Sequence, residues 1–457
     1  MSRIAARQVS LFPELEVVSA RDSAVPSATN ILGNLSDRIA ADLDIEPLDA
    51  TFRDSGAAPF HSWFPYLEGY SPRFVRRVRS AYLPAARHVL EPFAGSGTTP
   101  IVLGQDGIAC SYAEANPAMA LVSAAKLNAM APGTDRKLLS KQLRALAASL
   151  PDRLRCVSAD EDLRSSYASA FGSSVFFTPD GLERVLRLRA VGTTIEAEAD
   201  ATVSDCFNVA VMSALIPSSL LKRAGDLRYR TPKELLQPLP DAIRLVQEKL
   251  VLMAGDVASI APSSAPSLFL VADARQLLQM PNTLFDGVIT SPPYLNGTNY
   301  IRNARLELWY LRRLSSKRHL RQLRDCVVTS GINDVDRNTP HASVSAGVEK
   351  VVSRLRAEAY DDRIAKMVGG YFVDMREVLR GIGSLVKPGV AVCVDIGDSL
   401  YAGVHVPTDE LLVEIGLDLG FDLADKVYLR KRRSKGGDEL RQTLLVFRKP
   451  FAAMQYN

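Results

Sequence analysis

The sequence has few cysteines, little net charge and no CxxC pair. Its five cysteines are scattered through 457 residues. An odd number of isolated cysteines argues against a disulfide framework and against a zinc site, and it is typical of a reducing cytoplasm. The net charge is only +4. The whole chain is therefore no polycation, and any surface for nucleic acid must come from local clustering of cations.

Segments that would enter or cross a membrane are also missing. The longest apolar run, Val209 to Leu221, is broken by Pro217 and is shorter than the roughly 20 residues that span a bilayer. The first residues lack the charged-then-apolar pattern of a secretory signal. Hydrophobic residues make up 47% of the chain, which is ordinary for a globular protein. We expect a cytoplasmic protein of two or three domains, with neither a membrane nor a metal as partner.

The most informative stretch runs from Phe285 to Tyr294 and reads FDGVITSPPY. Val288 and Ile289 are β-branched and apolar, which favours a strand covered on both faces. Pro292 and Pro293 then fix two φ angles and remove two N–H donors, so the strand cannot continue. The pattern predicts a buried strand that ends abruptly in a rigid loop.

This loop suits methyl transfer to an amine that is conjugated with a ring. Such an amine is a poor nucleophile because its lone pair is delocalised. The Ser291 hydroxyl and the Pro292 carbonyl could accept the two amine hydrogens and so localise the lone pair. The ring of Tyr294 could hold the base by stacking. A plain strand-ending turn with a chance Pro-Pro pair is the competing interpretation.

A second informative stretch reads as strand, glycine turn and helix. The stretch runs from His88 to Thr99, and the helix should begin near Thr98. Glycines in the turn between strand and helix allow a ligand to approach the backbone. The turn lacks the ending of a phosphate loop and the spacing of a dinucleotide GxGxxG motif. A further strand, Ile108–Glu114, ends in an acid, which at this place commonly accepts hydrogen bonds from ribose hydroxyls. A simple surface acid is the alternative.

The α/β rhythm stops at about residue 130 and resumes near 266. Four helices are expected in the gap: Lys137–Ala148, Pro179–Val191, Asp205–Leu215 and Asp241–Ala254. After it come strands at 268–272 and 390–396, a long helix at 362–385, and a strand-turn-strand pattern at 426–448. The sequence thus predicts an N-terminal extension (1–50), an α/β fold in two halves (51–130 and 266–457), and a mostly helical insertion (131–265).

Three motifs together resemble the S-adenosylmethionine-dependent DNA amino-methyltransferases, which modify cytosine N4 or adenine N6. They are EPFAGSGTT at 91–99, the strand-end acid Glu114, and SPPY at 291–294. The resemblance covers about 60–130 and 268–449. It implies a Rossmann-like, seven-stranded sheet with helices on both faces and a terminal antiparallel hairpin. It also implies S-adenosyl-L-methionine as cofactor and double-stranded DNA as substrate, with no metal.

The resemblance assigns catalysis to the SPPY loop. Ser291 and the carbonyl of Pro292, held by Pro293, would orient the target amine, and Tyr294 would stack on a base flipped out of the duplex. Ser rather than Asp at position 291 is commoner among cytosine-N4 enzymes. Cytosine N4 is therefore favoured over adenine N6 as the methylated atom.

The resemblance also assigns a cofactor site. Glu114 would hold the ribose hydroxyls, and Asp273, with Ala274 beside it, would read the adenine amine. The glycine turn would contact the methionine and ribose through Glu91, Phe93, Ala94, Gly95, Ser96, Gly97 and Thr98. The family's motif often begins with Asp where this chain has Glu91. The aromatic segment around Phe64, Ser71 and Phe74 resembles the motif that covers the methionine end, and Ser291 would also border the cofactor.

Two basic stretches mark the expected DNA surface. Tyr300–Arg324 is expected to be helical and carries eight cations against one acid, Glu307. Lys222–Lys233, inside the insertion, carries five cations. Such clustering favours a polyanion surface, and we expect 300–345 and the insertion to face DNA. The candidate contacts are Arg228, Arg230, Arg302, Arg305, Arg312 and Arg313.

Other functions remain possible for the same motifs. Some RNA methyltransferases of the guanine-N2 type pair a similar glycine motif with a similar Pro-Pro loop. Glutamine methyltransferases also use such a loop, although theirs usually begins with Asn. A non-catalytic DNA-binding protein could keep the fold for cofactor sensing, but its motifs would be expected to degrade. A restriction-modification role with a cognate nuclease is a further possibility.

Overall fold

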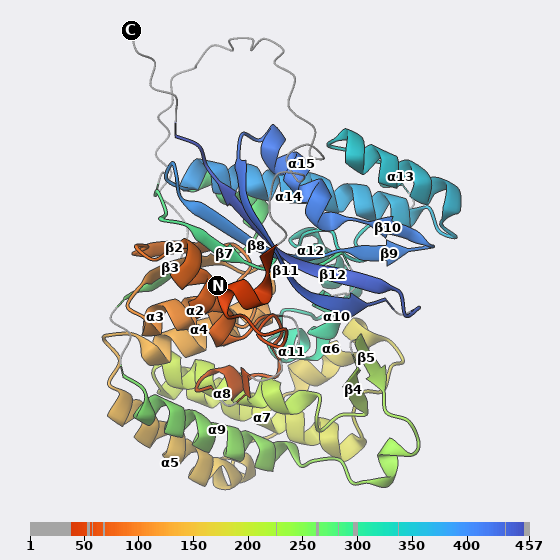
Figure 1. The fold of residues 1–457 in the computed structure, drawn as a ribbon. Helices are drawn as coiled ribbons and strands as arrows, with labels where there is room; N and C mark the ends of the chain where they lie inside the picture. Colours follow the sequence, from red (N-terminus) through yellow and green to blue (C-terminus); the bar gives the residue numbers. More distant parts are fainter. Residues whose placement is uncertain are drawn as a thin grey trace, which may run out of the picture.

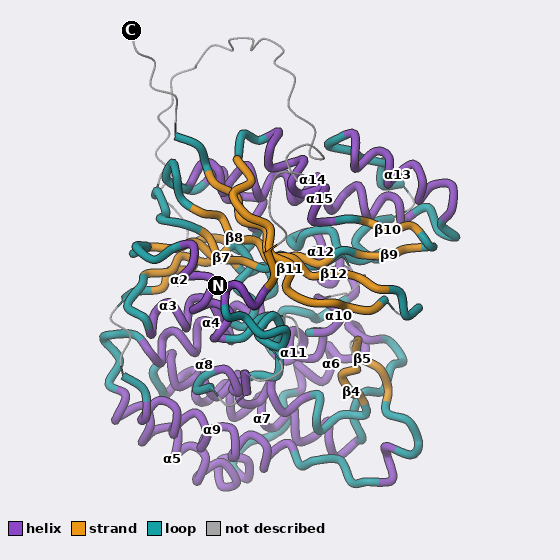
Figure 2. The backbone as a smooth tube through the Cα atoms, viewed as in Figure 1, coloured by secondary structure: helices purple, strands orange, loops and turns teal. Residues whose placement is uncertain are grey.

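The computed structural model describes residues 38–451, except 53, 54, 57, 67, 68, 225, 262–264, 282, 296–299, 337 and 435. Residues 1–37, most of the expected N-terminal extension, therefore lie outside the described residues. Strands form a central layer, and helices pack above and below it (Figure 1, Figure 2).

The central layer is one mixed sheet of eight strands in the order β1-β11-β12-β8-β7-β2-β3-β6. The strands are β1 (Arg38–Ile39), β2 (His88–Glu91), β3 (Ala109–Ala113), β6 (Ser267–Val271), β7 (Val288–Thr290), β8 (Ala391–Gly397), β11 (Asp422–Arg433) and β12 (Glu439–Arg448). Neighbouring strands are parallel, except where β12 pairs with β8 and with β11. The predicted Rossmann-like α/β fold with a terminal antiparallel hairpin is confirmed. The expected seven strands are joined by β1, which extends the sheet beyond β11.

Helices cover both faces of this sheet. On one face lie α2 (Pro72–Tyr82) and α3 (Thr98–Gln105), and on the other lie α13 (Ala346–Glu358), α14 (Arg363–Leu385) and α15 (Thr408–Asp418). Successive strand residues point to opposite faces. Val89 and Ile289 accordingly pack with α2 and α3, whereas Leu90 and Val288 pack with α14 and α15. This double coverage explains why most residues of the central strands are apolar, with Glu91 of β2 and Asp395 of β8 as buried exceptions.

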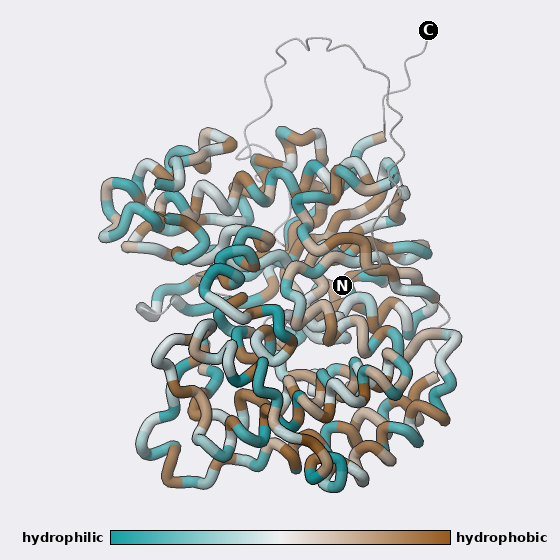
Figure 3. Tube along the Cα trace, turned by 180° about the vertical axis from the view of Figure 1, so that it is seen from behind, coloured by the Kyte–Doolittle hydropathy of each residue, from teal (hydrophilic) through white to brown (hydrophobic). Residues whose placement is uncertain are grey.

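A helical region follows β3 in the chain. It contains α4 (Pro117–Met130), α5 (Arg136–Arg155), α6 (Glu161–Phe171), α7 (Pro179–Glu198), α8 (Ala201–Leu215) and α9 (Ala242–Ser259). Brown and teal segments alternate along these helices in Figure 3, as expected for helices with one buried face. The sequence analysis did not identify α6. Only Leu163 and Ala170 of that helix are buried, so its apolar periodicity is weak.

The helical region also contains a short hairpin that the sequence analysis did not predict. Its strands are β4 (Leu221–Ala224) and β5 (Asp226–Tyr229), which lie within the basic stretch 222–233. A second two-stranded ribbon, β9 (Ser399–Tyr401) with β10 (Val404–Val406), follows β8. Four 3₁₀ turns complete the described structure: Ala40–Leu43, His61–Trp63, Glu234–Leu236 and Ala274–Gln279.

The basic stretch after residue 300 is helical, as expected, but it is not continuous. It forms three short helices, α10 (Tyr300–Asn303), α11 (Arg305–Tyr310) and α12 (Lys317–Asp325). The break after α11 occurs at Arg312, whose φ of 57° is incompatible with a right-handed helix. Trp309 and neighbouring apolar residues of α11 pack into the core of the helical region. Within the described ranges, no helix has both the length and the apolar character to cross a membrane.

Candidate functional site

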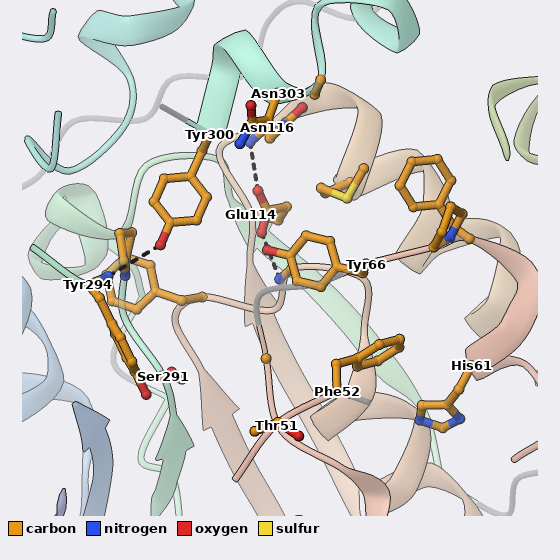
Figure 4. Close-up of a pocket in the computed structure, with 18 of the residues that line it drawn as sticks. Thr51, Phe52, His61, Tyr66, Glu114, Asn116, Ser291, Tyr294, Tyr300 and Asn303 are labelled. Carbon is orange, nitrogen blue, oxygen red and sulfur yellow. Dashed lines mark hydrogen bonds between the residues drawn. The ribbon is translucent and has the colours of Figure 1, made fainter. Parts of the chain in front are cut away.

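One cavity of about 1110 Å³ lies at the carboxyl ends of the central parallel strands. The glycine turn after β2 reaches it through Gly95, and the loop after β7 reaches it through Ser291. Glu114, after β3, and Asp273, after β6, line the same space. Four consecutive strands of the sheet order thus deliver their following residues to one cavity, because parallel strands end at a common edge. Figure 4 shows Glu114 between the aromatic side chains on one side and Tyr294 and Tyr300 on the other.

The shape of the glycine turn is fixed by its backbone conformation and by hydrogen bonds from α4. Gly95 and Gly97 have φ values of 54° and 90°, a region that glycine adopts without a steric penalty. The Ser123 hydroxyl donates to the Gly95 carbonyl at 2.8 Å, and the Lys126 ammonium donates to the Ser96 carbonyl at 2.7 Å. Burial, followed by repulsion from Lys249, lowers the pKa of Lys126 to about 7. Helix α4 therefore fixes the carbonyl side of the turn and leaves its N–H side toward Glu114.

Glu114 is fixed by two backbone amides. The Gly95 N–H donates to Glu114 Oε2 at 2.7 Å, and the Asn116 N–H donates to Oε1 at 2.7 Å (Figure 4). Each carboxylate oxygen can accept a further hydrogen bond. The carboxylate lines the cavity, so it presents two oriented acceptors to a bound molecule.

Aromatic residues from the segment before α2 form the wall opposite the SPPY loop. Phe52, His61, Phe64 and Tyr66 all line the cavity. A Cβ built on Gly95 would lie 3.1 Å from the hydroxyl and ring of Tyr66. At position 95, any residue other than glycine would bring its Cβ into tight contact with the Tyr66 side chain. The sequence analysis did not single out Tyr66, although it stands in the aromatic run 61–66.

Two other residues expected in this motif stand behind the wall. Ser71 caps α2 by accepting a hydrogen bond from the Phe74 N–H at 3.1 Å, as its sequence pattern predicts. The Phe74 ring is buried and stacks on Tyr70, with 4.8 Å between ring centroids. Neither Ser71 nor Phe74 lines the large cavity. Their contacts position Tyr70, whose hydroxyl donates a hydrogen bond to Glu91.

Glu91 is a buried link between two strands. It accepts hydrogen bonds from the Tyr70 hydroxyl, the Phe93 N–H and the Thr290 hydroxyl. Burial raises the pKa of Glu91, and these hydrogen bonds oppose the shift. Glu91 is not among the residues that line the large cavity. In the structure it ties the end of β2 to the end of β7, which carries the SPPY loop.

The remaining turn residues divide between two spaces. Phe93 and Gly95 line the large cavity. A small adjoining space of about 40 Å³ is bordered by Phe93, Ala94, Gly95, Ser96, Thr98 and Ser291, among others. Gly97 is the N-cap of α3, and a Cβ there would lie 3.0 Å from the Ser123 hydroxyl.

Asp273 and Ala274 line the cavity at the end of β6. The Asp273 carboxylate caps the following 3₁₀ turn by accepting from the Arg275 N–H at 2.9 Å. Its oxygens also accept from the Arg275 guanidinium, the closest contact being 2.7 Å. Asp273 is thus oriented by Arg275, and an adenine amine would share its oxygens with that guanidinium.

The SPPY loop lines the cavity with all four residues, Ser291, Pro292, Pro293 and Tyr294. The Tyr294 hydroxyl donates to Asp395 Oδ2 at 2.9 Å, and its N–H donates to the Tyr300 hydroxyl at 3.3 Å. The Arg432 guanidinium lies over the Tyr294 ring, 5.1 Å from its centroid. One face of the ring is therefore already in contact with a cation.

Asp395, on β8, is the main residue of this site that the sequence analysis missed. It is buried and accepts from the Gln442 amide at 2.9 and 3.0 Å. Burial raises the pKa of Asp395 to about 6, and hydrogen bonds from Gln442, Tyr294 and Ser291 oppose the rise. The signal was an acid inside the apolar run 390–396, since a carboxylate in a buried strand needs partners.

The six arginines expected to contact DNA have different surroundings. Arg305 lies over the Phe176 ring at 4.3 Å, and Arg312 forms an ion pair with Asp160. Arg228 pairs with Glu234 at 2.8 Å, and Arg230 donates to main-chain carbonyls at 3.1 Å. Arg302 and Arg313 are exposed. Intramolecular contacts therefore engage at least four of the six, and Arg228 and Arg312 are exposed in addition to Arg302 and Arg313.

No group of three or more His, Cys, Asp or Glu side chains suited to a metal ion occurs in the part of the chain that the structure describes. No protein-family model matches the chain. It is 23% identical over 449 residues to the type II methyltransferase M.BsoBI of Geobacillus stearothermophilus, covering 85% of this chain and 86% of the relative.

It is also 22% identical over 453 residues to the type II methyltransferase M.AvaI of Nostoc sp. (strain PCC 7120), covering 88% of each. The chain therefore resembles methyltransferases along most of its length. Among solved structures, an rRNA methyltransferase, aviRa from Streptomyces viridochromogenes, aligns with 10% identity and a TM-score of 0.28 over 93% of this chain and 97% of that one. The fold assignment rests on the strand order.

Proposed function

We propose that this protein is a site-specific DNA methyltransferase that moves a methyl group from S-adenosyl-L-methionine to the exocyclic amine of a flipped base. Cytosine N4 is the favoured acceptor and adenine N6 the second. The observation that carries the proposal is the meeting of the Gly95 turn and the Ser291 loop in one cavity. Similarity to two type II methyltransferases over most of the chain supports it.

The cavity fits a cofactor together with a base. Sites for single small ligands occupy roughly 300–1,000 Å³, and this one has about 1110 Å³. Gly95 has a positive φ, and a Cβ there would come within 3.1 Å of the Tyr66 side chain, so a glycine is favoured at this point of the turn. The Glu114 carboxylate, oriented by two backbone N–H groups, is suited to the two hydroxyls of a ribose. When bound, the cofactor supplies a methyl group activated by a sulfonium sulfur.

The protein's part in the reaction is to orient the amine. The Ser291 hydroxyl oxygen and the Pro292 carbonyl accept its two hydrogens, which directs the nitrogen lone pair toward the methyl group. Asp395 contacts the Tyr294 hydroxyl and the Ser291 side chain. It therefore acts as a positioning residue for the loop. No covalent enzyme intermediate is required, because positioning and hydrogen bonding supply the rate.

Access of the base requires that it leave the duplex. Flipping costs a few kcal/mol, and stacking on Tyr294 returns about 1–3 kcal/mol. Because Arg432 covers one face of Tyr294, the base would stack on the opposite face or displace the guanidinium. Recognition of the DNA site is assigned to the helical region at 131–265 and to the basic segment 300–345.

The test is methyl transfer to nucleic acid by the purified protein. Radiolabelled S-adenosyl-L-methionine is incubated with genomic DNA, with tRNA and with ribosomal RNA, and the labelled bases are identified after digestion. We expect label in DNA, as N4-methylcytosine at one short sequence. Label confined to RNA would contradict the DNA assignment, and no transfer to any nucleic acid would contradict methylation of bases.

A further inference from the structure

The hairpin of β11 and β12 extends beyond the sheet at the edge where the cavity lies. β12 pairs with β8 only as far as Gln442, opposite Gly397. Beyond that pair, the residues 430–433 and 439–441 continue as a ribbon of two strands. The ribbon is drawn in dark blue in Figure 1 and extends beyond the rest of the sheet, with hydrogen bonds from Arg432 and Arg441 to Asp398 at its base. Among the described residues of this ribbon, only Leu440 is buried.

The projecting ribbon is strongly basic. Residues 430–441 hold six cations, Arg430, Lys431, Arg432, Arg433, Lys435 and Arg441, against two acids, Asp438 and Glu439. Twelve residues thus carry a net charge of +4, equal to that of the whole chain. Both acids have local partners, because Glu439 pairs with Lys431 at 2.9 Å and Asp438 bonds to Ser434.

Both faces of the ribbon bear cations. Arg430 and Arg432, two residues apart, line the cavity next to Tyr294. Lys431 and its cross-strand partner Arg441 point to the opposite face and are exposed, as is Arg433. Arg432 and Arg433 donate to the main-chain carbonyls of Asp398 and Gly437. Those bonds orient the guanidinium groups without neutralising them.

The position of the ribbon's cations beside the cavity indicates what they bind. A base that reaches Ser291 stays attached to its strand, so the phosphates beside it must lie at the cavity mouth, where Arg430 and Arg432 come from the ribbon. We infer that the β11–β12 ribbon, residues 430–441, is a binding arm for the sugar-phosphate backbone of the DNA strand that carries the target base. The inference rests on the proposed function. It adds contacts outside the helical region and outside 300–345.

The experiment compares charge removal at the two ends of one strand. Arg433→Gln with Arg441→Gln removes two exposed cations from the arm, neither of which lines the cavity. Arg448→Gln with Lys449→Gln removes the same charge at the far end of β12. Binding of a duplex oligonucleotide is measured by fluorescence anisotropy from 50 to 200 mM salt, and methylation is measured at saturating cofactor.

The arm variant should lose about two phosphate contacts, so its slope of log K against log salt becomes shallower by about 2. Between 50 and 200 mM salt, wild type would lose about tenfold more affinity than the variant. Its KM for DNA should rise while kcat at saturating DNA and the Kd for cofactor stay unchanged. The Arg448/Lys449 variant should behave as wild type.

An arm variant with the salt slope and KM of the control would overturn the inference while leaving DNA methylation by the wild type intact. If wild type instead transferred methyl groups only to RNA, the proposed function would fail first, and the two failures would be distinguished. Thermal unfolding of both double variants checks that each remains folded.

Discussion

The two loops that meet in the cavity reach their shapes by different means. The turn at 92–97 depends on glycines with positive φ, and its carbonyls are held by Ser123 and Lys126 of α4. The loop at 291–294 depends on two prolines, and its side chains are held by Asp395 of β8. In both, local sequence fixes the backbone, whereas distant buried polar groups fix the atoms that face the ligand. In the proposed mechanism, a ligand approaches the first loop closely and the second loop orients the substrate.

Removal of the Ser291 hydroxyl should distinguish the functions of the two loops most clearly. Ser291→Ala should lower kcat about 10²–10³-fold, the usual cost of losing one oriented hydrogen-bonding group at a reacting centre. The Kd for cofactor should stay within about twofold, since the glycine turn is untouched. Calorimetric cofactor titration and single-turnover methylation measure the two effects. Collapse of cofactor binding with normal turnover at saturation would show that Ser291 belongs to the cofactor side.

A side chain at Gly95 should have the reverse effect. Gly95→Val places a Cβ 3.1 Å from Tyr66 at a φ of 54°, a backbone strain of about 1–3 kcal/mol. We expect cofactor affinity to fall about 10–100-fold, with kcat largely recovered at saturating cofactor. Gly133→Val is the matched control, because a Cβ there would meet nothing within 4 Å. Unchanged cofactor affinity in the Gly95 variant would remove the turn from the cofactor site.

The smallest of the three effects is expected at Asp395, and it depends on pH. Burial raises its pKa to about 6, so the wild-type kcat/KM should fall as pH drops below about 6 and the carboxylate is protonated. Asp395→Asn should lower the rate about tenfold at neutral pH, the loss of one charge-assisted hydrogen bond of about 1.5 kcal/mol. Its profile should be flat across that range. A wild-type profile in the variant would mean that Asp395 has no part in orienting the loop.

The Asp395 carboxyl affects the pH dependence of stability in the opposite direction to the pH dependence of kcat/KM. The folded state binds the Asp395 proton more tightly than the unfolded chain does, because the pKa is raised from 3.8 to about 6. This residue's contribution to stability is therefore largest at low pH and declines as pH rises from about 4 to about 6. Asp395→Asn should lack that decline. Urea unfolding at several pH values measures it.

The sequence predicted the parts of this fold that depend on neighbouring residues. The buried strand before the prolines, the capped helix after Ser71 and the strand-turn-strand ending follow from local patterns, and the sheet class follows from their order. The expected helical structure at 300–324 is present, but it is divided into short helices, since Trp309 and its neighbours are buried in the helical core. Tertiary packing overrides helical propensity there.

The candidate site was predictable only where a motif supplied a position. Gly95, Glu114, Asp273 and Ser291 line one cavity. Asp395 lies on β8, which pairs with the SPPY strand, and Gln442 lies on β12, which pairs with β8, and no local pattern reveals this strand order. Ser71, Phe74 and Glu91 belong to the same motifs, but they are buried and do not line the cavity. A motif therefore locates a segment, but the arrangement of the sheet determines which side chain of that segment reaches the cavity.

Helix α4 joins two parts of the molecule that a domain diagram would separate. Its Ser123 and Lys126 hold the glycine turn, while its apolar side packs in the same core as α5 to α9. Excising residues 131–265 would strip that apolar side and loosen the turn. An exchange of this region, made to test its proposed role in DNA recognition, would thus succeed only if the donor supplies a matching surface for α4.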